Sequence, residues 1–268
     1  MNSSDVTDIN TLARFVSNDM TDTSFNLSET GSADCLVLCG SAILHCAESV
    51  FRAVQSRQVA KTLVICGGIG HSTILLYDAV AAHPQYKALS AEIRGMPESQ
   101  ILHRIGRDFF QLDEYAAKHA IRVIVEDKST NCGANAIETK KVLDAAGVAT
   151  PSSLVIVQDP TMSLRTKASF EKTYAGIAMP VCKTCPSFVP QVKLEGTQVV
   201  FDNPPDEHLW SMPRFIDLLI GEIPRLRNDS NGYGPSGKGF IVQIDIPDEV
   251  EAAWARLTKK VEAGRSTM

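Results

Sequence analysis

The chain has 268 residues, of which 44% are hydrophobic and 21% are charged. These are ordinary values for a globular protein, and they exclude a chain that is disordered throughout. The 26 Lys and Arg residues and 31 Asp and Glu residues give a formal charge of −5 without a long basic run, which argues against nucleic acid or an anionic membrane as the partner.

Residues 1–32 are rich in Ser, Thr, Asn and Asp, with one weakly amphipathic piece around Leu12 to Val16. We expect a polar leader made of a short helix and a mobile link. No basic start followed by an apolar stretch is present, so no secretory signal is predicted. No run of about 18 apolar residues predicts a transmembrane helix. The seven cysteines are an odd number and lie mostly in apolar runs, which predicts buried, reduced thiols and a cytoplasmic location.

From residue 33 onward, short β-rich runs alternate with longer helical patterns, which indicates parallel βαβ units. The expected strands are short apolar runs, as in a sheet covered by helices on both faces; they span 34–38, 62–66, 121–125, 154–157 and, more weakly, 181–185. A first helix is expected to follow the first strand and to end near residue 57. Four further helices are expected over about 72–82, 97–110, 131–146 and 162–174. Pro97 followed by Glu98 is a sound helix start.

The pattern loosens from Pro186. A helix near 209–220, a loop rich in Gly, Pro and Asn, an alternating strand-like run over 240–246 and a last helix from Pro247 predict a smaller C-terminal subdomain. The expected organisation is therefore a leader over 1–32, an α/β domain over 33–185 and an accessory subdomain over 186–268.

Ligands of open parallel sheets bind at the carboxyl ends of the strands. The loop after the second strand carries Gly67, Gly68, Gly70, His71 and Ser72. Its glycines let a ligand approach the backbone, and free N–H groups at the start of the following helix favour an anion. The alternative is a tight turn and nothing more, and the loop lacks the third glycine of a dinucleotide fingerprint.

Polar residues also gather at the next strand end. Ser129 or Thr130 is a natural N-cap for the helix that follows, and Asn131, Asn135 and Glu138 share one face of it by spacing. This stripe either binds a polar ligand or forms an exposed, capped helix end.

Asp159 directly follows the fourth strand, and Arg165 lies one to two turns into the next helix. The carboxylate can accept ribose hydroxyls or act as a base, and the guanidinium can clamp an anionic group. The alternative is an Asp that caps its own helix and an Arg on the surface.

Several long motifs in one order resemble the YdcF branch of the SanA/ElyC/YdcF family. They span 66–73, 126–135, 157–162, 221–227 and 229–235, so the resemblance covers nearly the whole chain after residue 33. The wider family pattern combines a glycine pair, a Glu that opens a helix, a Ser/Thr–Asn cluster and a downstream Arg. In this sequence it corresponds to Gly67, Gly68, Glu98, Ser129, Asn131, Asn135 and Arg165.

The resemblance implies a Rossmann-like domain of about five parallel strands with an accessory subdomain and a pocket at these motifs. It also implies binding of S-adenosylmethionine or a similar nucleotide-like ligand, with no assigned reaction. An ordinary methyltransferase arrangement is not expected, because the Gly-rich turn follows the second strand and no acid ends that strand.

Three sharper motifs are incomplete. Residues 232–239 nearly match a P-loop, but Gly239 replaces the metal-binding Ser/Thr. The Cys182–Cys185 pair lies in an expected strand rather than at a helix start, where a thiolate would be stabilised. Ser72 is followed in hydrolase order by Asp159 and His208, yet the closing glycine of a nucleophile elbow is missing.

The histidines show no metal-ligand spacing, so no metal is expected, and only His71 falls in the predicted mouth. No acid–base pair beside a nucleophile stands out, so the catalytic residues stay unknown. The sequence therefore predicts a pocket for a nucleotide-like small molecule. The alternatives are a hydrolase acting on phosphate or ester bonds and a module that senses a ligand without turning it over.

Overall fold

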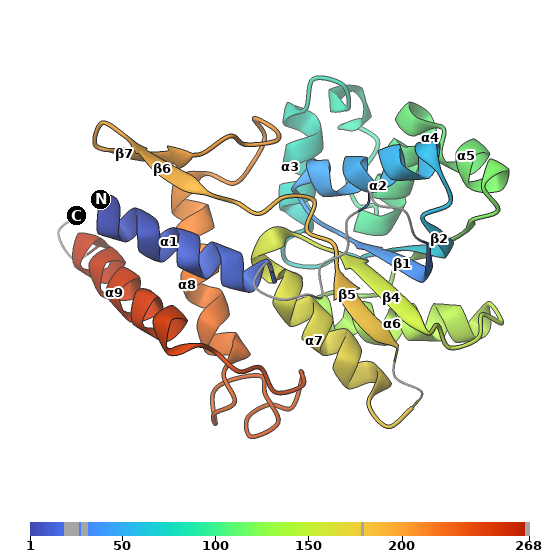
Figure 1. Cartoon of the computed structure of the whole chain (residues 1–268). Coiled ribbons are helices and arrows are strands. Elements are labelled where there is room, and N and C mark those ends of the chain that lie inside the picture. The colour runs from blue at the N-terminus through green and yellow to red at the C-terminus, as the bar shows by residue number, and fades with distance from the viewer. Residues whose placement is uncertain (19–26, 28–31, 178–179, 266–268) are drawn as a thin grey trace.

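The protein is described by a computed structural model that covers residues 1–18, 27, 32–177 and 180–265. Five strands form one all-parallel sheet in the order β3-β2-β1-β4-β5 (Figure 1). Each is nearly the apolar run that the sequence predicts, and the bounds are Ala33–Cys39 (β1), Ala60–Cys66 (β2), Arg122–Glu126 (β3), Ser153–Val157 (β4) and Val181–Thr184 (β5). The predicted α/β class is confirmed, and the arrangement is Rossmann-like.

Alternate residues of each central strand pack against different helices, because successive side chains of a strand point to opposite faces. Leu36 and Leu38 of β1 join a core with one helical layer, whereas Cys35 and Val37 join a second core with the other layer. The first layer contains α2 (Leu44–Ser56), α3 (Thr73–Ala82), α4 (Glu98–Phe110) and α5 (Leu112–Lys118). The second contains α6 (Cys132–Ala145) and α7 (Ser163–Tyr174). Two 3-10 turns complete this part, Lys87–Leu89 (η1) and Pro160–Met162 (η2).

A second group of elements packs beside the sheet (Figure 1). It consists of an antiparallel hairpin, Val192–Glu195 (β6) with Gln198–Phe201 (β7), and the helices Met212–Leu226 (α8) and Asp248–Arg265 (α9). The N-terminal helix Ser3–Val16 (α1) belongs to this group, because its Ile9 and Leu12 share a buried core with Phe215 and Leu219 of α8. The structure thus differs from the expected separate leader. The apolar face of α1 can be read from the sequence, but the helix on which it packs, α8, is far away in the chain and cannot.

Two further details of the C-terminal half differ from the sequence prediction. The run 240–246 forms no strand and instead lays alternate side chains, such as Ile244 and Ile246, on the core beside α9. The β6–β7 hairpin was not predicted, because its strands have only four residues each. The predicted mobile link, over 19–26 and 28–31, lies outside the described residues.

All seven cysteines are buried, and none forms a disulfide. This agrees with the predicted reduced thiols, including those of Cys182 and Cys185. Among the residues described, no helix combines the length and the apolar character that crossing a membrane requires.

Helix α8 continues through Pro224, which has no N–H to donate to the carbonyl of Ile220 one turn earlier. The indole N–H of Trp254, on α9, donates to that carbonyl at 2.9 Å. The same indole ring lies 4.2 Å from the guanidinium carbon of Arg227. Trp254 therefore completes the hydrogen bonding of α8 and fixes the helix against α9, because a buried carbonyl needs a partner.

Replacing Trp254 by Phe keeps most of the packing and removes this hydrogen bond. We expect Trp254→Phe to lower the free energy of unfolding by about 1–3 kcal/mol, measured by urea denaturation. In a Pro224→Ala background the backbone N–H of residue 224 can reach Ile220, so the same change should cost less. An equal cost in the two backgrounds would show that the indole acts through packing alone.

Candidate functional site

The carboxyl ends of β1 to β4 meet at one edge of the sheet, and α8 lies across them. Between them is a cleft of about 450 Å³. The sheet side contributes the loops after the four strands together with the first residue of α4, and the other side is α8 and the loop that follows it. The lining residues are Gly40, Gly67, Gly68, Gly70, His71, Ser72, Leu75, Glu98, Ser129, Thr130, Asn131, Cys132, Asn135, Gln158, Met162, Arg165, Arg214, Leu218, Glu222, Arg225 and Tyr233.

Eleven of the twelve residues that the sequence singles out line this cleft; the exception is Asp159. The loops that carry them follow β2, β3 and β4, which are separated in sequence. They meet because parallel strands present their carboxyl ends at one edge. The expectation that these residues share one cavity therefore agrees with the fold, although sharing a cavity does not by itself assign them a ligand.

The floor of the cleft is built from two loops in close contact. A Cβ on Gly68 would lie 2.6 Å from the carbonyl oxygen of Ser129, and one on Gly70 would lie 2.8 Å from that of Thr130. Neither position has room for a side chain. The N–H of Gly68 donates to the Ser129 carbonyl at 2.6 Å, and the N–H of Gly70 donates to the hydroxyl of Thr73 at 2.8 Å.

The glycine turn consequently offers fewer free donors than the sequence suggests, because the N–H groups of all three glycines bond to protein; that of Gly67 reaches the carbonyl of Glu126 at 3.0 Å. The N–H groups of His71 and Ser72 have no partner within the described part of the chain. Any anion at this turn would meet these two amides, at the start of α3.

The loop after β3 is held by Glu126, whose carboxylate is buried at the end of the strand. One oxygen accepts the N–H groups of Lys128 at 2.5 Å and Ser129 at 2.8 Å, and the other accepts the Ser129 hydroxyl at 2.5 Å. The Ser129 side chain thus organises the loop, while its carbonyl receives Gly68. At the start of α6, the side chain of Asn131 accepts the N–H of Ala134 at 3.0 Å and caps the helix.

Glu98, the first residue of α4, lies against the ends of β1 and β2. Its side chain covers Gly40 and Gly67: a Cβ on Gly40 would stand 2.9 Å from the Cβ of Glu98, and one on Gly67 would stand 3.1 Å away. Gly67 also has a φ of 148°, which side-chain-bearing residues rarely adopt. The Glu98 carboxylate accepts the hydroxyl of Thr73 at 2.8 Å.

Burial raises the pKa of Glu98, and the hydrogen bond from Thr73 only partly opposes this. A carboxyl with a raised pKa at the wall of a cleft is a candidate for accepting or donating a proton. The sequence assigned Glu98 to the site through the family pattern. The structure adds that its carboxyl is shielded from water and bonded to Thr73.

The opposite wall is one stripe of α8. Arg214, Leu218, Glu222 and Arg225 recur at spacings of four, four and three residues, which places them on one face of a helix. Phe215, Leu219 and Ile223 lie on the other face and are completely buried in the accessory core.

Arg165, on α7, crosses from the sheet side and pairs with Glu222 through its Nε. Arg225 lies on the far side of that carboxylate, with 3.6 Å between its Nη1 and a Glu222 oxygen. Two guanidinium groups therefore share one buried carboxylate. Arg214 is exposed and has no hydrogen-bond or ion-pair partner among the described residues, so cationic groups exceed carboxylates along this wall.

Asp159 faces a different space. Its carboxylate accepts the N–H and hydroxyl of Thr161 at 2.9 and 2.7 Å and the indole N–H of Trp210 at 3.1 Å. It caps η2, which is the structural alternative considered from the sequence, and burial raises its pKa. It lines a neighbouring cavity of about 530 Å³ that shares Gly40, Glu98 and Arg214 with the cleft. The structure therefore shows the capping contacts of Asp159, and its role toward a ligand stays a prediction.

The incomplete motifs acquire no chemistry from the fold. Ser72 and His208 both border the neighbouring cavity, but the hydrogen bonds of His208 go to Asp206, at 2.8 Å from its N–H and 2.9 Å from its Nδ1. Asp159 is occupied as described, so no serine triad forms among these residues. The P-loop-like segment folds onto Arg227, because a Cβ on Gly232 would lie 2.7 Å from its carbonyl carbon.

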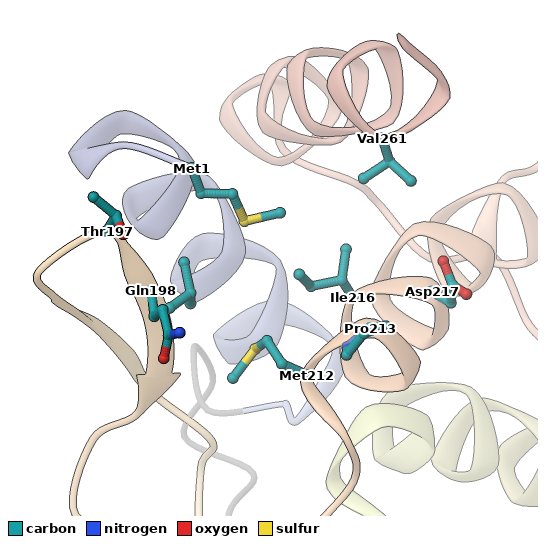
Figure 2. Close-up of a pocket in the computed structure, with 9 residues that line it drawn as sticks. Met1, Thr197, Gln198, Met212, Pro213, Ile216, Asp217 and Val261 are labelled. Carbon is teal, nitrogen blue, oxygen red and sulfur yellow. The ribbon is translucent and has the colours of Figure 1, made fainter. Parts of the chain in front are cut away.

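A third cavity, of about 640 Å³, opens between α1, the hairpin, α8 and α9. Figure 2 shows Met1, Met212 and Ile216 around it, together with Gln198 and Val261. It is mostly apolar and shares no residue with the cleft. The charged and polar side chains that a catalytic or anion-binding site needs are therefore found in the cleft at the sheet edge rather than in this third cavity.

Sequence reasoning missed Arg214, Glu222 and Arg225 as site residues. The signal was present in two forms, the 4-4-3 spacing opposite an apolar face and the motif over 221–227. It was not used, because only the fold brings α8 to the strand ends. The chain matches no known family model, so the resemblance to YdcF proteins remains an expectation.

Replacing Gly40 by Ala would force a methyl group into Glu98. We expect Gly40→Ala to lower the free energy of unfolding by about 1–3 kcal/mol, as overpacking does, measured by guanidinium denaturation. Gly133→Ala is the matched control, because its Cβ would meet only Asn131 Oδ1 at 3.4 Å. Alanine is the better helix former, so the control should be neutral or stabilising. Equal stability of the two variants would contradict the packing of Glu98 on Gly40.

Glu98→Gln tests the raised pKa. A carboxyl whose folded-state pKa is raised contributes stability that is complete below its unfolded pKa, about 4.3, and is lost as pH rises through the folded value. Gln keeps the acceptor for Thr73 and cannot ionise. The stability of Glu98→Gln relative to the parent should therefore increase from pH 4 to pH 8, as measured by denaturation at each pH. Exposed Glu114→Gln on α5 is the control, and an equally large increase there would count against a special environment at Glu98.

Proposed function

We propose that the cleft binds a nucleotide-like small molecule that carries a phosphate or carboxylate group. The observation that supports this most directly is that three arginines, Arg165, Arg214 and Arg225, line the cleft, while only two of them, Arg165 and Arg225, pair with its Glu222 carboxylate. Glu222 neutralises about one of these charges, which leaves guanidinium groups for an incoming anion. Guanidinium forks match carboxylate and phosphate oxygens in pairs.

The neighbouring cavity supports the nucleotide-like part of the proposal. It joins the cleft at Glu98 and Arg214 and has Leu75, Leu209 and Trp210 in its wall. Ligand sites combine such apolar and aromatic surface with a few polar groups that set orientation. A ligand with an anionic group at α8 and a planar base toward Trp210 would use both spaces.

S-adenosylmethionine is the first candidate, as the resemblance suggests. Its carboxylate suits the arginine wall, and its amino group and ribose hydroxyls are donors that suit the Glu98 carboxylate. Arg214 and Glu98 both border each of the two spaces, so one ligand can meet an anion-binding and a donor-binding group together.

A hydrolase acting on phosphate or ester bonds is the second candidate, and Glu98 is the observation that favours it. Burial raises its pKa, and it stands in the same cleft as the arginines, so it can deprotonate a water molecule while they hold the anionic group. In this reading Glu98→Gln keeps ligand affinity and loses turnover. If neither the parent protein nor the Glu98→Gln variant turns a bound ligand over, the site senses or carries that ligand.

The test is a thermal-shift and calorimetry panel of S-adenosylmethionine, S-adenosylhomocysteine, ATP and NAD, with product analysis for each ligand that binds. A ligand at a hundred times its dissociation constant should stabilise the protein by about 2.7 kcal/mol. Arg214→Gln should weaken binding by about tenfold or more, since a hydrogen bond to a charged group contributes about 1.5–3 kcal/mol.

Arg122→Gln is the matched control. Arg122 opens β3 at the opposite end of the sheet and donates to the Ala146 carbonyl at 2.8 Å. The proposal fails if no anionic ligand of the panel binds, or if the Arg122 and Arg214 variants bind equally well.

A further inference from the structure

Three histidines and two carboxylates that are distant in sequence gather where α2, the end of α3 and the loop before α8 meet. Ligand atoms of His83, Asp206 and His208 all lie within 4.8 Å of one another. A second trio, His45, Glu48 and Asp206, satisfies the same limit. Asp206 belongs to both, so the five side chains form one cluster.

Distances within the cluster are close to those of a metal site. Asp206 Oδ1 lies 2.9 Å from Nδ1 of His208, and the rings of His83 and His208 have centroids 5.3 Å apart. In a tetrahedral site with bonds of about 2.0–2.1 Å, two ligand atoms are about 3.3 Å apart. Small side-chain rotations would therefore bring the first trio onto an ion.

The surroundings hold the cluster in place. His83 ends α3 and stacks on Tyr86 with 4.0 Å between ring centroids. Glu48 Oε1 lies 3.6 Å from His83 Nε2 and accepts the hydroxyl of Tyr86 at 2.7 Å. Its other oxygen accepts from Arg52 at 2.6 Å. Among the described residues, Arg52 is the one Lys or Arg that pairs with either carboxylate of the cluster, and it pairs with Glu48, which leaves a favourable setting for a cation.

We propose that His83, Asp206 and His208 bind a divalent transition-metal ion such as Zn²⁺, with Glu48 and His45 beside them. Imidazole together with carboxylate is a donor set that Zn²⁺ and its neighbours in the first transition row accept, whereas Mg²⁺ and Ca²⁺ prefer oxygen alone. Three protein ligands leave a coordination position open.

The cluster borders the space next to the cleft. His208 lines the cavity that also contains Trp210 and Glu98, so an ion bound here would face that cavity.

The proposal depends only on the cluster and not on the identity of any small molecule in the cleft. It departs from the sequence expectation of no metal, which rested on spacing: only His45–Glu48 and Asp206–His208 are near neighbours in the chain, and His83 comes from a third element.

The experiment uses the full chain, stripped of metal by a chelator and then dialysed free of it. Zn²⁺ is titrated by calorimetry, and Co²⁺ is titrated by absorption spectroscopy as a coloured substitute. We expect saturation near one equivalent, release of Co²⁺ by Zn²⁺, and no sulfur-to-cobalt charge-transfer band, because all seven cysteines are buried elsewhere. Asp206→Asn and His208→Gln should each weaken binding by about tenfold or more.

His103→Gln is the matched control, because His103 also pairs with an aspartate, Asp113, at 3.0 Å but belongs to no cluster of three such ligands among the described residues. It should bind metal like the parent. Circular dichroism checks that each variant is folded, and His208, which is only half-buried, is the substitution least able to disturb folding. The proposal is overturned if the parent binds no ion, if thiolate bands appear, or if a folded His208 variant binds as tightly as the His103 control.

Discussion

The buried pair between Arg165 and Glu222 is the contact on which the cleft depends. Arg165 belongs to α7 of the sheet domain and Glu222 to α8 of the accessory group, and their side chains are only 14% and 3% exposed. Removing one partner of such a pair leaves an uncompensated charge, which typically costs about 3–5 kcal/mol. Because Glu222 lies in the middle of the α8 stripe, the pair also fixes which face of α8 is presented to the strand ends. The same interaction therefore contributes to holding the two halves of the protein together and to setting the two walls of the site, beside contacts such as that of Trp210 with Asp159.

The sheet side of the cleft is set by backbone contacts that only glycine allows. Gly68 and Gly70 admit the loop after β3, and Gly40 admits the side chain of Glu98. The glycines of the turn after β2 could be read from the sequence as a phosphate-binding turn, yet all of their N–H groups are occupied within the protein. Their main effect is to bring Glu98 between two strand ends, where water is partly excluded and its pKa rises.

The parts of this architecture that were predictable are those that depend on local pattern. Apolar runs identified the five strands, and the rule that parallel strands end at one edge brought Gly67, Ser129 and Arg165 to one cavity. Features that depend on long-range packing were not predictable. The sequence could not decide between the two roles considered for Asp159, because a capping aspartate and a ligand-binding one look alike in sequence; the structure shows the cap. The α8 stripe and the histidine cluster need the return of the chain after residue 186, which no local pattern specifies.

The distribution of charge in the cleft defines what kind of molecule fits it. Of its two carboxylates, Glu222 pairs with two guanidinium groups, whereas Glu98 accepts a hydrogen bond from the hydroxyl of Thr73 and, within the described residues, from no other group. The α8 wall therefore attracts anions, and the sheet wall attracts a hydrogen-bond donor or a cation. A ligand with an anionic end and a donor-rich end is favoured in one orientation, because reversing it would place an anion against Glu98 and donors against arginines. Orientation follows from the fact that the two carboxylates, which are alike in sequence, lie in different electrostatic surroundings.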